Sequence, residues 1–189
     1  MPGPPWPSSG ARPTRCSTDL RVSGDLPGPD DLSVPIPLPI PSERIPAMSD
    51  SENPNLRSAR LEWTGEGLAF SGRAGGSDPI LLDGDSRKGP SPMEALLLSM
   101  VACMAIDVRM ILEKSRVALD GLSVEVEGER RGEVPKRYER IRVRFLVEGP
   151  GEEDRGRIER AIELSEEKYC SVTHTLRPDL DIQTDFEIA

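Results

Sequence analysis

The stretch that decides the fold is SPMEALLLSMVACMAIDVRMILEKS, residues 91–115. Residues 95–106 hold one polar side chain, Ser99, so a helix here is apolar on every side and must be surrounded by protein. Its first four residues, SPME, form an S-x-x-E capping box with proline in the first turn. We therefore predict a long, buried central helix.

The apolar run in this helix is stopped by Asp107 and Arg109. A membrane-spanning helix needs about 18 or more apolar residues. We therefore expect the core helix of a soluble protein and no association with a membrane.

The composition narrows the class of protein further. The chain has 189 residues, enough for one domain with a hydrophobic core. Its net charge of -9 and pI near 4.8 argue against nucleic-acid binding. Three cysteines are too few for a disulfide-stapled secreted scaffold and suit free thiols in a reducing compartment. The opening residues lack the apolar region of an export signal. We expect a cytoplasmic protein.

The N-terminal quarter differs from the rest of the chain. Residues 1–47 contain 12 of the 19 prolines, including the run VPIPLPIP at residues 34–41, and this density predicts a disordered or polyproline-like extension. From Met48 onward the composition is that of a globular protein. The sequence leaves two interpretations open: Met48 is the true start, or the extension is a dispensable tail.

The remaining pattern predicts an α+β fold. Strands are indicated by alternating apolar and polar residues and by turn residues, and a second helix by an apolar face that follows Gly151. An antiparallel sheet with the helices packed to one side accommodates this order. The expected elements are a hairpin at residues 59–70, a strand at 79–82, paired strands at 122–127 and 141–147 with opposed acidic and basic faces, a helix from about 152, and a last strand at 182–188.

Metal and cofactor motifs are missing from the sequence. There is one histidine, His174, and no CxxC or HxxxH spacing, so we expect no protein-built zinc site. Neither a P-loop nor a G-x-G-x-x-G motif occurs, so we expect no cofactor. The main chemical clue is the pair of thiols Cys103 and Cys170, although each of them taken alone is better explained as a small buried core residue.

Three stretches resemble the OsmC and organic hydroperoxide resistance (Ohr) proteins, and in particular their YhfA-like branch. The resemblance covers roughly residues 57–189. The stretches are GPSPMEALLLSMVACMAIDV at 89–108, GLSVEVEGERR at 121–131 and ERAIELSEEKYCSV at 159–172.

The resemblance implies an OsmC-like α+β fold in an intertwined homodimer, with the long helices at its centre and active sites at the subunit interface. It also implies the chemistry of a thiol peroxidase that reduces organic hydroperoxides in defence against oxidative stress. Cys103 would be the peroxidatic thiol and Cys170 the resolving one. The family's reductants are lipoylated proteins or other dithiols.

The chain departs from the family at two positions. The family's glutamate lies ten residues before the first cysteine, where this chain has Met93; Glu94 lies nine before and is therefore rotated by about 100° on the helix. A capping role already explains Glu94. For the arginine that pairs with this glutamate no local motif matches, and Arg60 and Arg73 are candidates by location only.

Three interpretations of function follow. The first is a two-cysteine organic hydroperoxide reductase, with Cys103, Cys170 and Glu94 as its candidate catalytic residues. The second is a non-catalytic OsmC-like dimer whose interface pocket binds a small apolar or electrophilic ligand. The third is a structural or stress-associated dimer in which the cysteines are merely packed.

Overall fold

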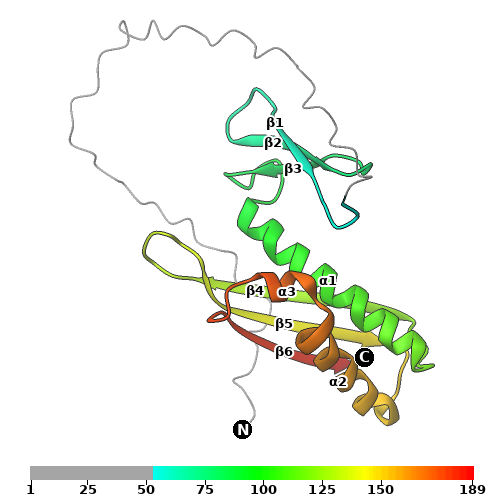
Figure 1. Cartoon of the computed structure of the whole chain (residues 1–189). Helices are drawn as coiled ribbons and strands as arrows, with labels where there is room; N and C mark the ends of the chain where they lie inside the picture. Colours follow the sequence, from blue (N-terminus) through cyan, green and yellow to red (C-terminus); the bar gives the residue numbers. More distant parts are fainter. Residues whose placement is uncertain (1–52) are drawn as a thin grey trace, which may run out of the picture. The chain divides into compact units, whose positions relative to one another are not determined.

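The structure, a computed structural model, describes residues 53–189 (Figure 1). The predicted extension, residues 1–47, and the predicted start at Met48 lie outside the described residues. The described chain has two three-stranded sheets and the two predicted helices, so the α+β class is confirmed. In chain order the elements are β1 (Ala59–Trp63), β2 (Ala69–Ala74), β3 (Ile80–Asp83), α1 (Pro92–Lys114), β4 (Gly121–Arg130), β5 (Tyr138–Glu148), the 3-10 turn η1 (Glu152–Asp154), α2 (Arg155–Leu164), the π-helical turn η2 (Ser165–Tyr169), the short α3 (Ser171–Thr175) and β6 (Asp181–Ile188).

The first sheet is antiparallel in the order β1-β2-β3. The predicted hairpin turn joins β1 to β2, and Trp63 lies opposite Phe70 across it. Gly65 and Gly67 both have positive φ angles in this turn, a conformation that glycine adopts without steric cost. The strand that follows, β3, confirms the run predicted at residues 79–82.

The long helix α1 begins and ends where the sequence predicts. The Ser91 hydroxyl accepts a hydrogen bond from the Glu94 backbone N–H at 3.4 Å. In return the Glu94 carboxylate accepts one from the Ser91 backbone N–H at 2.7 Å. The capping box is therefore formed on both sides, and two N–H groups that the helix leaves unpaired find acceptors.

The second sheet has the order β4-β5-β6. As predicted, β4 and β5 pair antiparallel, with Glu125 opposite Arg144 and Glu127 opposite Arg142. The expectation of a wholly antiparallel sheet is wrong for the last strand, because β6 runs parallel to β5. The helical segments between β5 and β6 form a crossover connection. After this crossover β6 enters the sheet in the same direction as β5.

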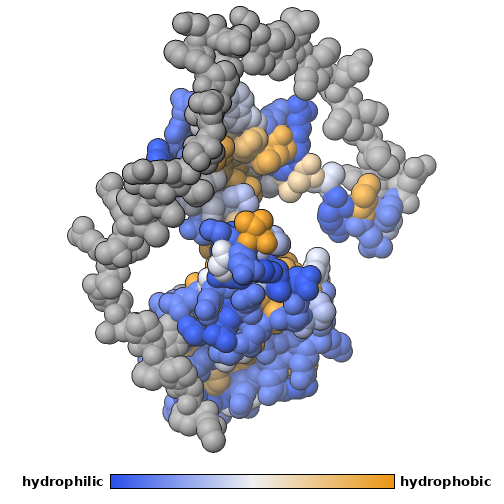
Figure 2. All heavy atoms as spheres, turned by 90° about the vertical axis from the view of Figure 1, so that its left-hand side faces the viewer, coloured by the Kyte–Doolittle hydropathy of each residue, from blue (hydrophilic) through white to orange (hydrophobic). Residues whose placement is uncertain are grey.

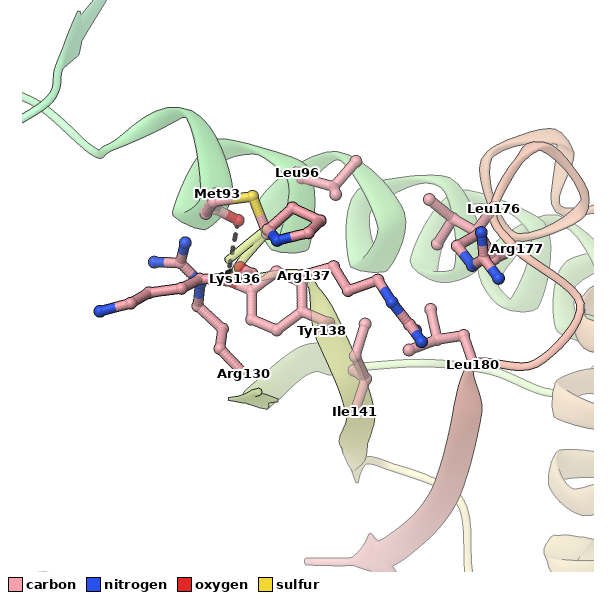
Figure 3. A pocket seen from close by; sticks show the side chains of 11 residues that line it. Met93, Leu96, Arg130, Lys136, Arg137, Tyr138, Ile141, Leu176, Arg177 and Leu180 are labelled. Atoms are coloured by element: carbon pink, nitrogen blue, oxygen red, sulfur yellow. Dashed lines mark hydrogen bonds between the residues drawn. The ribbon is translucent and has the colours of Figure 1, made fainter. Parts of the chain in front are cut away.

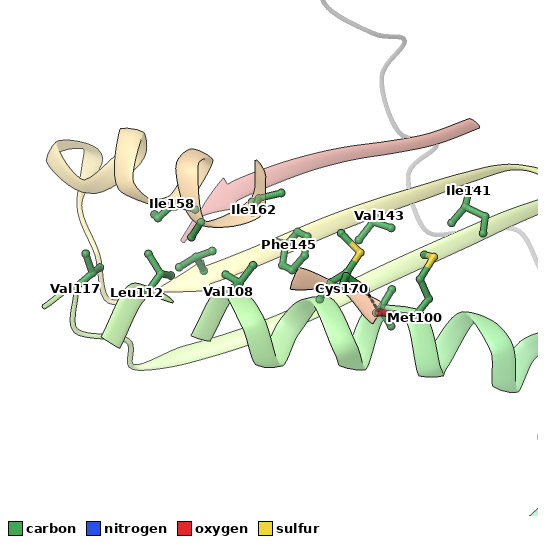
Figure 4. Packing of buried hydrophobic residues seen from close by; sticks show 14 of the residues in the cluster. Met100, Val108, Leu112, Val117, Ile141, Val143, Phe145, Ile158, Ile162 and Cys170 are labelled. Carbon is green, nitrogen blue, oxygen red and sulfur yellow. Dashed lines mark hydrogen bonds between the residues drawn. The ribbon is translucent and has the colours of Figure 1, made fainter. Parts of the chain in front are cut away.

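The core lies between α1, α2 and the second sheet (Figure 4). One side of α1 packs against β4 and α2, and the alternate residues of β5 that face the helices are buried. Burial of each large side chain here contributes about 1.5–3 kcal/mol. The fully buried set includes Met100, Met104, Val108, Leu112, Ile141, Phe145, Val147 and Ile158.

The opposite side of α1 is uncovered in the single described chain. Leu98, Ile106 and Met110 are 55%, 60% and 45% exposed. The expectation that the helix is buried on every side is therefore not met within one chain, because the second sheet and the segments α2, η2 and α3 leave these side chains uncovered. By length and composition α1 is also apolar enough to cross a membrane, yet a third of the relevant window, 33%, is already buried inside the protein.

We predict that Ser91→Ala lowers the free energy of unfolding by about 1 kcal/mol, because the capping hydroxyl is lost. Urea unfolding at one fixed protein concentration measures the change. Ser99→Ala, an exposed serine inside the same helix, is the control. A loss in the Ser91 variant no larger than in the control would contradict the capping role.

Candidate functional site

The structure brings Cys103 and Cys170 together. Cys103 lies midway along α1 and is partly exposed, whereas Cys170 lies between η2 and α3 and is fully buried. Their sulfur atoms and a carboxylate oxygen of Asp107 all lie within 4.8 Å of one another. The site is therefore a compact group of two thiols and one carboxylate.

The turn η2 places the Cys170 side chain against α1. The Cys170 backbone N–H donates to the Ser165 carbonyl oxygen at 2.8 Å, which closes the π-helical turn. Cys170 then leaves the helical conformation, with φ -68° and ψ 95°, and becomes the N-cap of α3. Its sulfur lies 4.0 Å from the Met100 carbonyl oxygen of α1 (Figure 4).

The surroundings of Cys170 favour the neutral thiol. Burial raises the pKa of Cys170, and the neighbouring Cys103 thiol adds to this effect. Thr173 works in the opposite direction, because its hydroxyl and its backbone N–H donate to the sulfur at 3.0 and 3.4 Å. Burial prevails, so the pKa stays above its usual value.

Asp107 supplies the carboxyl group of the site. It lies one turn after Cys103 on the same side of α1. The buried Ser165 hydroxyl donates to one of its carboxylate oxygens at 3.0 Å. Within residues 53–189 no lysine or arginine forms an ion pair with Asp107.

The structure does not bring Glu94 to the thiols. The two residues Glu94 and Cys103 are nine positions apart, about 13 Å along the helix axis. The Glu94 carboxylate instead accepts hydrogen bonds from both donors of Ser91 and from the Ser86 hydroxyl. These hydrogen bonds lower the pKa of Glu94, and the bond from the Ser91 backbone N–H has the largest effect. Its observed surroundings are those of a helix cap.

The two candidate arginines lie on the first sheet. Arg60 and Arg73 stand opposite each other on β1 and β2, and Arg60 pairs with Glu62 at 2.6 Å. In the described part of the chain, neither makes a hydrogen bond to Cys103 or Cys170. Within a single chain, therefore, neither arginine supplies a positive charge to the thiols.

Sequence reasoning missed three polar residues of the site. Asp107 could have been recognised from the sequence, because it is a polar residue one turn after Cys103 at the end of an apolar run. Ser165 and Thr173 have no comparable signal, because their roles depend on the π-helical turn and the cap that follows it.

Comparisons with known proteins agree with this architecture. The family model described as "OsmC-like protein" matches residues 83–185, more than half of the chain. The protein YhfA of Escherichia coli K12 is 40% identical over 131 residues, 69% of this chain and 96% of YhfA. The chain belongs to the OsmC-like family.

Solved structures extend the comparison for this OsmC-like chain. A hypothetical protein from Aquifex aeolicus VF5 shares 32% identity, with a TM-score of 0.64 over 71% of this chain and 96% of that one. An organic hydroperoxide resistance protein OsmC from Legionella pneumophila is 13% identical, with a TM-score of 0.51 over 70% and 96% of the two chains. At that identity the likeness shows a shared fold.

A pocket of about 420 Å³ opens beside the first turns of α1 in this OsmC-like chain (Figure 3). Its wall is mostly apolar and includes Met93 and Leu96, and the Tyr138 hydroxyl donates to the Met93 carbonyl oxygen at 3.0 Å. Neither thiol lines it. Four cationic side chains lie around it: Arg130, Lys136, Arg137 and Arg177.

We predict that Cys170 in the Cys103→Ser variant is alkylated with a pH midpoint above that of the same thiol in urea, because burial opposes its thiolate. Thr173→Val removes a donor to the sulfur and raises the midpoint further. Thr175→Val, whose hydroxyl binds the Ser171 carbonyl instead, is the control.

The same pKa shift makes stability depend on pH. The folded protein keeps the Cys170 proton where the unfolded thiol has lost it, so the free energy of unfolding falls as pH rises past about 8.5. Alkylation midpoints that are equal in the folded and unfolded protein would contradict this account of the site.

Proposed function

We propose that this OsmC-like protein is a thiol-dependent peroxidase that reduces organic hydroperoxides through Cys103 and Cys170. The observation that carries the proposal is the contact between two thiols from separate elements, whose sulfur atoms lie within 4.8 Å. A disulfide needs a sulfur–sulfur distance of about 2.05 Å, so the two sulfurs have at most about 2.8 Å to close.

The roles follow from exposure. Cys103 is partly exposed and can meet a substrate, whereas Cys170 is fully buried behind it. The Cys103 thiolate attacks the O–O bond; the distal oxygen stays on sulfur as sulfenic acid, and the alkoxide leaves as alcohol with one proton. The Cys170 thiol then displaces water and closes the disulfide. A dithiol or lipoylated protein is the reductant that we expect to reopen it.

An apolar substrate fits the surroundings better than hydrogen peroxide does. Leu96 lies in the wall of the pocket beside α1, seven residues before Cys103. This spacing places the two residues on the same side of the helix, about 10 Å apart along its axis. The organic part of a hydroperoxide would lie along this side of the helix, with its O–O bond at Cys103.

We propose further that the protein acts as a homodimer. The uncovered stripe of α1, formed by Leu98, Ile106 and Met110, is one surface that a second copy would cover. A second lies on the first sheet, where Leu61, Trp63 and Ile80 are more than half exposed. Figure 2 shows hydrophobic residues gathered in the region of the β1–β3 sheet, above a largely hydrophilic lower part. Apolar surface of this extent is typical of protein–protein contact.

A second copy would also supply the missing cation. A thiol on an apolar helix reacts slowly unless a positive charge stabilises its thiolate. Arg60 and Arg73 are paired on the first sheet, on the face opposite Leu61, Trp63 and Ile80, because side chains alternate along a strand. In a dimer that presents this face to the α1 of the other subunit, one of these arginines would approach its Cys103.

We predict that the pre-reduced protein consumes one equivalent of cumene hydroperoxide per chain, faster than it consumes hydrogen peroxide. Peptide mapping without reductant should yield a Cys103–Cys170 disulfide. Cys103→Ser abolishes consumption, because the attacking thiol is lost. Cys170→Ser still consumes one equivalent but leaves a sulfenic acid that dimedone traps on Cys103.

Equal activity in the two variants would contradict the assigned roles. Thiols that stay reduced in the native protein would leave the fold in place and favour the alternative, an OsmC-like dimer that binds a small apolar or electrophilic ligand without turnover. Glu94→Gln, which alters the helix cap, tests whether the carboxylate has a catalytic share.

We predict that Ile106→Glu converts the dimer into monomer, because it buries a charge at the stripe of α1. Sedimentation velocity measures the mass, and thermal melts at several concentrations test whether folding and association are linked. Val134→Glu is the matched control, since Val134 is 85% exposed on the β4–β5 loop. A native protein that sediments as a monomer, with a melting temperature independent of concentration, would contradict the dimer.

A further inference from the structure

The group formed by Cys103, Asp107 and Cys170 has the composition of a metal site. Two ligand atoms come from one side of α1, four residues apart, and the third comes from the N-cap of α3. The two sulfurs and the carboxylate oxygen lie within 4.8 Å of one another. The ligands thus converge from elements that are distant in sequence.

The charges of this group favour a cation. All three side chains are acids, and their deprotonated forms repel one another at this spacing. In the described residues no lysine or arginine pairs with Asp107 to offset the repulsion. A divalent cation bound between them would turn three repelling groups into ligands.

We propose that the reduced Cys103–Cys170 pair and Asp107 bind a thiophilic divalent cation, of which zinc is the example to test. Zinc accepts two thiolates and one carboxylate and prefers tetrahedral geometry. With Zn–S bonds of about 2.3 Å and a Zn–O bond of about 2.1 Å, tetrahedral ligand atoms lie about 3.6–3.8 Å apart. That spacing falls inside the 4.8 Å limit of the three atoms. The fourth position is left for water or an exogenous ligand.

Neighbouring residues already orient two of the ligands. The Ser165 hydroxyl donates to Oδ2 of Asp107 at 3.0 Å, which fixes the orientation of the carboxylate. Thr173 donates to the Cys170 sulfur from its hydroxyl at 3.0 Å. Hydrogen bonds of this kind fix the orientation of metal ligands and tune their basicity. The cysteines, the carboxylate and their donors form a built site.

Zinc binding would compete with oxidation at the same sulfurs. Binding replaces two S–H bonds by two Zn–S bonds and releases two protons, with no transfer of electrons. A hydroperoxide that takes two electrons from the thiolates is reduced with two protons to alcohol and water, and the disulfide that forms removes two ligands and releases the ion. The metal would therefore hold the pair reduced, and an oxidant would expel the metal. This inference needs no peroxidase activity, because binding to the reduced thiols is sufficient.

The sequence alone predicts no protein-built zinc site, because it contains no local pair of ligands such as CxxC. Here the fold supplies the third ligand, Cys170, from a separate element. A search of local spacings does not reveal a site of this kind.

The test uses the full chain, reduced and freed of metal, titrated with Co²⁺ and then Zn²⁺. We expect one ion per chain, the visible bands of tetrahedral Co²⁺ with a thiolate charge-transfer band, and release of two protons per ion. Cys103→Ser and Cys170→Ser should each abolish the charge-transfer signature of the two-thiolate site.

Asp107→Asn keeps both thiols and removes the carboxylate ligand. We expect it to lower Zn²⁺ affinity at least tenfold. Ser165→Ala should weaken binding about 10- to 100-fold through the orientation of Asp107. Glu113→Gln, an exposed acid on the same helix, is the matched control and should bind as the native protein does.

Two results would overturn the proposal: no bound ion in the reduced native protein, or equal affinity in the Asp107→Asn and Glu113→Gln variants. Peroxide consumption is measured separately. Zinc binding without consumption would remove the peroxidase function alone, and consumption without zinc binding would remove the metal site alone.

Discussion

The packing of α1 against the second sheet is the interaction on which the rest of the structure depends. From residue 95 to residue 106 the helix is apolar on every side apart from Ser99, but the sheet and α2 cover one side of it. That side forms the core with the alternate residues of β5. The other side, with Ile106 at 60% exposure, carries apolar surface that the described chain leaves open. The same helix thus forms the core of one subunit and, in our proposal, the centre of a dimer.

The chemistry lies at the boundary between these two sides. Cys103 is neither in the core nor fully exposed, and Cys170 reaches it because the turn η2 ends just before it. Burial raises the pKa of Cys170 and favours its neutral thiol, and a carboxylate oxygen of Asp107 lies within 4.8 Å of both sulfurs. Two kinds of positive charge would stabilise a thiolate at this site. One is an arginine from a second subunit, which would serve peroxide chemistry, and the other is a metal ion. Both proposals rest on the same electrostatic feature, which is a pair of thiols beside a carboxylate.

Local signals explain what could be predicted from the sequence. The capping box at Ser91 and the alternation of β4 and β5 each involve residues close together in the chain, so helix α1 and the hairpin were predictable. The parallel pairing of β6 was not, because it depends on the path of the crossover. The meeting of Cys103 with Cys170 was expected from family resemblance rather than from any pattern. Ser165 was missed because its role requires a π-helical turn.

The measurement that tests the central claim most directly is the equilibrium of the reduced protein with glutathione redox buffers, with the products separated by mass. If the fold holds the Cys103 and Cys170 sulfurs in contact, oxidation proceeds to a disulfide within one chain, and mixed disulfides with glutathione stay minor. The potential of the couple then gives the effective concentration of one thiol at the other. Glutathione adducts on Cys103 without an intrachain disulfide, at any buffer ratio, would contradict the contact on which the account of this site rests.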